Sequence, residues 1–129
     1  MTVTYVIDGS RVTGLERFWD VIGEAVNGPG GYFGRGLDSF ADCLRGGMGT
    51  PDDGDFVIEW RDHTVSARAL GHEETARRLR GLLGRAHPSN LPQVREELAQ
   101  AEAGAGPTLF DHLREIIRDE TAPGTLRLL

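Results

Sequence analysis

The sequence contains no lysine, one cysteine and no long apolar run, and each scarcity excludes a class of protein. All 14 basic residues are arginine, so a phosphate-binding loop ending in Gly-Lys-Ser/Thr cannot be present. A single cysteine excludes an internal disulfide framework and a multi-cysteine zinc site. No apolar run approaches the ~20 residues of a membrane span, and the first residues do not resemble a secretory leader. We therefore expect a cytoplasmic protein with no membrane partner.

Acidic residues outnumber basic ones, and the whole excess lies in the first half of the chain. The 129 residues carry a formal net charge of −6. Residues 1–60 hold ten acids and four arginines, whereas residues 61–129 hold ten of each. Because phosphate contacts require positive charge, nucleic acid is not an expected partner. The asymmetry is the first indication of function.

Apolar periodicity predicts a single α/β domain over residues 1–129, with a small parallel sheet covered by crossover helices. Thr13 and Glu16 have the spacing of a capping box at the start of the first helix. Strands are predicted at 2–8, 56–60 and 125–129, and helices at 15–26, 37–45, 72–86, 90–104 and from about 107.

Several patterns suggest chemistry but favour ordinary structural roles. The four histidines are too widely spaced for a metal-binding helix motif, and we expect surface or capping roles for His63, His72, His87 and His112. Cys43 lacks a local catalytic signature and is expected to be structural. The glycine-rich stretch 28–36 is expected to be a turn or a place of close backbone approach. The sequence therefore predicts no metal and no cofactor.

The acids of the second predicted helix are more informative. Asp38 and Asp42 lie at positions i and i+4, so they neighbour each other on one face, away from the apolar stripe. Like charges at this spacing are mildly destabilising. The first-turn position explains Asp38 through the helix dipole, and Arg45 is placed to pair with Asp42. The pattern alone leaves open a solvated face, an acidic binding face or a catalytic carboxylate pair.

Two blocks together resemble the barstar family. The stretch from Tyr32 to Leu44 reads YFGRGLDSFADCL, with two aromatics and a glycine, then Leu-Asp and a second aspartate four residues later. The stretch FVIEWR at 56–61 resembles the second strand of the family, and residues 107–129 resemble its last helix and strand. The resemblance implies a three-stranded parallel sheet with packed helices.

The resemblance also implies a function, since barstar-like proteins are intracellular inhibitors of secreted guanyl-specific ribonucleases. Helix 37–45 and the preceding loop would plug the nuclease active site, with Asp42 standing where a substrate phosphate binds. The set expected to bind the nuclease, one-to-one and with no catalytic residue among them, is Tyr32, Phe33, Gly34, Arg35, Asp38, Ala41, Asp42, Arg45 and Glu115.

Some residues depart from the family pattern. Ala41 stands where the motif often has tryptophan, and Arg35 and Gly36 stand where the best-known member has an acid and an amide. Residues 63–106 exceed what short members need. This inserted helical segment is either extra cover for the sheet or a second contact surface.

Two other functions remain compatible with the sequence. One is a small metal-dependent hydrolase that uses Asp38, Asp42 and Glu59 around a divalent cation. The other is a barstar-like interaction module whose partner is not a ribonuclease.

Overall fold

The structure is a computed structural model that describes residues 1–129. The chain forms three strands, six α-helices and two short 3-10 turns. In chain order these elements are β1 (Val3–Asp8), η1 (Gly9–Arg11), α1 (Leu15–Asn27), α2 (Leu37–Arg45), β2 (Phe56–Arg61), α3 (His63–Ala69), α4 (His72–Leu83), η2 (Pro88–Asn90), α5 (Leu91–Glu102), α6 (Leu109–Glu120) and β3 (Leu126–Leu128).

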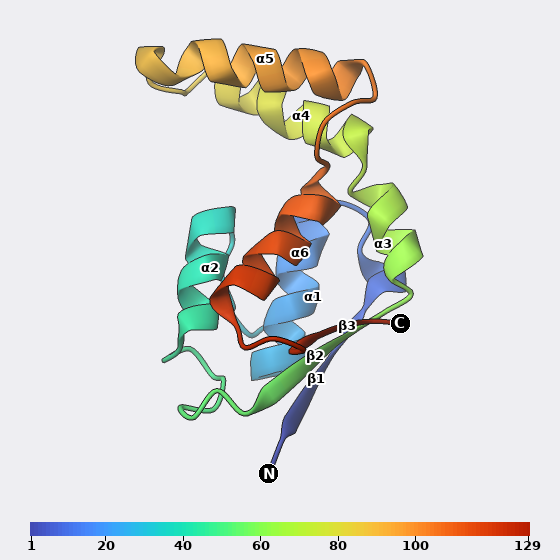
Figure 1. The fold of residues 1–129 in the computed structure, drawn as a ribbon, viewed down its shortest axis with the longest axis vertical. Helices are drawn as coiled ribbons and strands as arrows, with labels where there is room; N and C mark the ends of the chain where they lie inside the picture. The colour runs from blue at the N-terminus through green and yellow to red at the C-terminus, as the bar shows by residue number, and fades with distance from the viewer.

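The three strands form one parallel sheet in the order β1-β2-β3, which confirms the expected α/β fold. Tyr5 pairs with Ile58, and Ile58 pairs with Leu126, so alternate residues of the three strands share one face. That face is apolar, and Ile7 and Trp60 on it are completely buried. Figure 1 shows α1, α2 and α6 gathered on one side of the sheet, where they cover this face.

Helix α1 forms where the apolar periodicity predicts it, but the expected capping box is wrong. The N-cap is Gly14, which makes no side-chain cap. The first backbone N–H of the helix, on Leu15, instead donates to Glu74 Oε2 of α4 at 2.7 Å. A helix N-terminus needs acceptors for its free N–H groups, and here a carboxylate from a distant helix supplies one.

Helix α3, which the sequence patterns do not predict, follows β2 almost without a connection. The chain turns at Asp62, whose φ of 50° is left-handed, a conformation that aspartate tolerates better than most residues. The helix is fixed by a buried polar chain. Trp60 Nε1 donates to Ser66 Oγ at 2.9 Å, and this hydroxyl donates to the Gly9 carbonyl at 2.9 Å. A short helix held by such tertiary bonds leaves little periodic signal.

Helices α4 and α5 confirm two predicted helices, although α4 ends at Leu83 rather than at residue 86. The two helices pack as a hairpin that extends away from the sheet (Figure 1). The hairpin has a small apolar core of its own, formed by Ala76, Leu79, Leu98 and Ala101. Thr75 Oγ1 accepts a hydrogen bond from the Leu109 backbone N–H at 2.9 Å, which ties the hairpin to the start of α6. No helix of the chain is both long enough and apolar enough to cross a membrane.

Candidate functional site

Helix α2 carries the acidic residues singled out in the sequence, and it is strongly amphipathic. Its inner face is anchored in the core by Phe40, Cys43 and Leu44. Asp38 and Asp42 lie on the opposite side and are exposed. Asp38 stands in the first turn, where a negative charge suits the helix dipole. The helix therefore presents two carboxylates to solvent from a rigid support.

The loop before α2 is folded back tightly on the helix. Phe33 is completely buried and its ring packs edge-on against Phe40, with the centroids 6.0 Å apart. Gly34 has a φ of 90°, and a Cβ at this position would lie 2.7 Å from the backbone nitrogen of Phe40. The side chain of Phe33 is therefore part of the core rather than a contact surface, and Gly34 allows the close approach. Both residues shape the loop that exposes Tyr32.

Asn27, the last residue of α1, holds both ends of the segment that contains α2. Its Nδ2 donates to the Tyr32 carbonyl and to the Met48 carbonyl, each at 2.8 Å. Tyr32 precedes the helix and Met48 follows it, so one side chain fixes the entrance and the exit. As a result, the ring of Tyr32, 47% exposed, stands on a tethered backbone.

Arg35 is occupied by contacts within the protein. Its guanidinium donates to Asp20 of α1 at 2.8 Å, and this bond lowers the pKa of the Asp20 carboxyl. Its backbone N–H donates to Ser39 Oγ at 3.1 Å, and that hydroxyl donates to the Gly36 carbonyl. These bonds stabilise the start of α2, and they place the Arg35 side chain between α1 and α2.

Arg45 joins the acidic face of α2 to α6. Its guanidinium donates to Glu120 at 2.7 and 3.0 Å and to Asp42 Oδ1 at 2.5 Å. The bond to Glu120 raises the pKa of Arg45 and lowers that of Glu120. Only one oxygen of Asp42 accepts from Arg45, and the Asp42 side chain remains 70% exposed. The carboxylate is thus oriented from one side and open on the other.

Two further residues expected to contact the nuclease, Glu115 and Ala41, lie on α6 and α2. Glu115 is exposed on α6, the helix that packs against α2 (Figure 1). Ala41 is half-buried between the two aspartates in sequence. Tyr32, Asp38, Asp42 and Glu115 are therefore exposed side chains on α2, its preceding loop and the neighbouring helix.

The geometry does not support the metal-dependent hydrolase. No group of three or more His, Cys, Asp or Glu residues is placed to hold a metal ion. Glu59, the third acid of that hypothesis, lies on β2 and pairs with Arg61 at 2.9 Å.

Cys43 is only 3% exposed, and burial raises the pKa of its thiol, which disfavours the reactive thiolate.

A comparison with protein families gives this arrangement a context. The model of the barstar family, described as the barnase inhibitor, matches residues 2–93 of the 129. The chain belongs to the barstar family. No curated protein matches the sequence.

The barstar match contains the whole of α2 and the loop before it. It also extends over residues 63–93, which include α3 and α4, and ends before α6 and β3. The family is one of inhibitors rather than enzymes, and its members bind a ribonuclease. Glu115 lies outside the matched range, so its place beside α2 rests on the fold alone.

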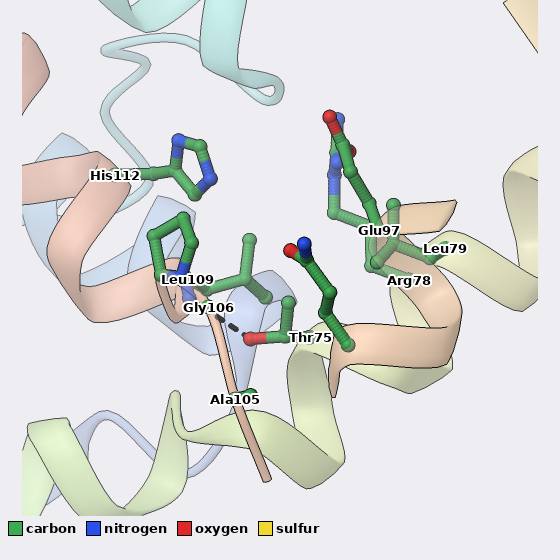
Figure 2. A pocket seen from close by; sticks show the side chains of 10 residues that line it. Thr75, Arg78, Leu79, Glu97, Ala105, Gly106, Leu109 and His112 are labelled. Carbon is green, nitrogen blue, oxygen red and sulfur yellow. Dashed lines mark hydrogen bonds between the residues drawn. The ribbon is translucent and has the colours of Figure 1, made fainter. Parts of the chain in front are cut away.

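Two hollows lined by residues of α4 were not found from the sequence. A groove of about 460 Å³ lies between α4 and the loop into α2, and a smaller cavity of about 190 Å³ lies between the α4–α5 hairpin and α6. Figure 2 shows the smaller one, with Arg78 and Glu97 on one side and His112 on the other. The groove is rich in arginine. Its sequence signal is weak, because Arg77 and Arg78 lie in α4 whereas Arg85 follows the end of that helix.

Proposed function

We propose that this protein inhibits a secreted guanyl-specific ribonuclease by covering its active site with α2 and the loop before it. The observation that carries the proposal is the pair of exposed carboxylates, Asp38 and Asp42, on a helix anchored in the core and inside the barstar match. We expect one inhibitor to bind one nuclease in the cytoplasm of the producing cell, which it protects from its own nuclease.

The physical basis is electrostatic imitation of the substrate. A ribonuclease must present cationic side chains to the phosphodiester of RNA. A carboxylate can satisfy those cations without offering a bond to cleave, and charge-assisted hydrogen bonds to it are strong. Asp42 is proposed to occupy the phosphate position, since its second oxygen is free of Arg45. Such a buried charge pair is favourable only when both partners are fully hydrogen-bonded.

The other proposed contacts surround this anchor. Asp38, Glu115 and the ring of Tyr32 form the exposed surroundings, and Ala41 leaves a shallow place between the acids. Phe33 and Gly34 contribute through the shape of the loop. Arg35 and Arg45 lie at the border of the interface and hold neighbouring acids in position. Because the segment that contains α2 is tethered on both sides of the helix, little conformational freedom remains to be lost on binding.

The decisive experiment titrates the purified protein into assays of guanyl-specific ribonucleases. Wild type is expected to inhibit stoichiometrically, whereas Asp42→Ala should lose most of its affinity while unfolding at the same temperature. Glu96→Ala is the matched control, because it removes one acid from the exposed face of α5. Equal inhibition by wild type and Asp42→Ala would remove Asp42 as the anchor. If wild type inhibits no such nuclease, the result favours a barstar-like module with a different partner.

Charge should also accelerate encounter with a basic nuclease. The association rate is expected to fall with added salt more than the dissociation rate rises, because exposed charges act mainly on encounter. Stopped-flow mixing at several salt concentrations measures both rates. A salt-insensitive association rate contradicts this part of the proposal.

A further inference from the structure

The groove between α4 and the loop into α2 is lined by four arginines, in a chain whose net charge is negative. Arg35 comes from the loop, Arg77 and Arg78 come from α4, and Arg85 comes from the turn that follows α4. Apolar side chains, including Leu15 and Trp19 of α1, also line it. Its volume of about 460 Å³ is within the range of sites that hold a ligand or an inserted side chain.

The four arginines form two groups, which differ in whether they are bonded to an acid of the protein. Arg35 is bonded to Asp20, and Arg77 is bonded to Glu74 and Glu16. Arg78 and Arg85 make no ion pair or side-chain hydrogen bond within the protein, in contrast to the two others. Arg78 is half-buried, and this burial lowers the pKa of its guanidinium. A cation that is partly removed from water without a bonded anion has unused capacity for one.

The groove adjoins the acidic face of α2. Gly36 and Leu37, at the start of that helix, line it directly. The charge of Asp38, the next residue, reaches Arg78, where it adds to the larger effect of Glu97 in partly offsetting the burial that lowers the guanidinium pKa. The groove arginines therefore lie next to the start of α2, so positive side chains and the negative Asp38 are neighbours there.

We propose that this groove receives a carboxylate of the ribonuclease that α2 binds, paired with Arg78 and Arg85. The inference rests on the proposed function and names a second contact of the same interface. A free polyanion such as RNA is less suited to the site, because Glu16 lines the groove and Asp38 follows it. A protein partner can carry both kinds of charge, with an acidic side chain that enters the groove and neighbouring cationic side chains that face Asp38 and Asp42. Such alternating charge fixes the register of a complex and rejects partners of uniform charge.

The test compares Arg78→Gln/Arg85→Gln with a control, Arg95→Gln/Arg127→Gln, which removes two exposed arginines from α5 and β3. Both variants make the protein more negative by the same amount, so long-range attraction to a basic nuclease rises equally. If the groove holds a carboxylate, the groove variant should bind roughly tenfold more weakly or worse, through faster dissociation. The control should change the dissociation rate less than about twofold. Thermal unfolding of both variants checks that each is folded.

Three outcomes overturn the proposal in distinguishable ways. If the groove variant binds as tightly as wild type or more tightly, while Asp42→Ala loses binding, only the groove contact is wrong. If wild type binds no guanyl-specific ribonuclease, the proposed function fails and the groove contact fails with it. In the third case, inorganic phosphate is titrated into the free protein and shifts the NMR signals of the Arg78 and Arg85 Nε–Hε groups until they saturate. If the groove variant also keeps full nuclease affinity, the groove is a phosphate site. Because the sequence contains no lysine, the arginine signals in this titration report every cationic side chain except histidine.

Discussion

Arg45 of α2 donates two hydrogen bonds to the carboxylate of Glu120 on α6, although the two residues are 75 positions apart in sequence. The same guanidinium holds one oxygen of Asp42. The proposed anchor of the interface is therefore oriented by a cation that is itself fixed to a different helix. This coupling makes the geometry of the acidic face depend on how α2 packs against α6.

Removing the distant carboxylate should affect binding more than folding. Glu120→Gln removes the negative charge and one of the two acceptor oxygens that hold Arg45, so the orientation of Arg45 and of Asp42 becomes less restricted. We expect weaker nuclease binding through faster dissociation, with little change in the association rate. Surface plasmon resonance measures both rates. Asp119→Asn, an adjacent exposed acid with the same charge change, is the control, and equal effects of the two variants contradict the coupling.

Gly34 should be among the least replaceable residues of the loop. Gly34→Ala combines a positive φ with a Cβ 2.7 Å from the backbone nitrogen of Phe40. We expect the free energy of unfolding to fall by about 2–4 kcal/mol. Gly28→Ala is the control, because its φ of 81° is similarly unfavourable but nothing lies within 4 Å of its Cβ. Denaturant unfolding compares the two, and a similar loss in both contradicts a role for the close approach.

Asn27 should restrain the loop and the exit of α2 together. Asn27→Ala removes the donors to the Tyr32 and Met48 carbonyls, and we expect a loss of about 1–2 kcal/mol in the free energy of unfolding. Hydrogen exchange should accelerate on both sides of α2, in residues 32–36 and 47–50. Asn90→Ala is the matched control, because its side chain caps no helix. Acceleration on one side only is inconsistent with a double tether.

Glu74 should make stability depend on pH. Hydrogen bonds from Arg77 and from the Leu15 backbone N–H hold the pKa of Glu74 below its unfolded value of about 4.5. Because the folded value is the lower one, Glu74 adds stability above pH 4.5 that is lost as the pH falls through the folded pKa. Glu74→Gln should cost about 1 kcal/mol at pH 7 and flatten this acid dependence. Urea unfolding between pH 3 and 7 measures it, with exposed Glu73→Gln as the control. An unchanged slope in Glu74→Gln contradicts the assignment.

Patterns within the sequence predicted the fold class and the helix that carries the proposed interface. The alternation at 2–8, the apolar run at 56–60 and the helical periodicity of residues 15–26 and 37–45 each reflect which face of a local element is buried. The position of Asp38 and Asp42 opposite the apolar stripe of α2 follows from helix geometry alone. For this reason the sequence alone predicts the acidic face, without any tertiary contact.

Tertiary structure decided the features that depend on residues distant in the chain. The capping of α1 by Glu74, the burial of Phe33 and the bond between Arg45 and Glu120 all join separate elements. Nothing in the local pattern distinguishes Phe33, which is buried, from its neighbour Tyr32, which is exposed. The arginine groove arises in the same way, because α4 meets the loop into α2 only after folding. Local periodicity determines which face of an element is apolar, but only packing determines which elements meet and which charges come together.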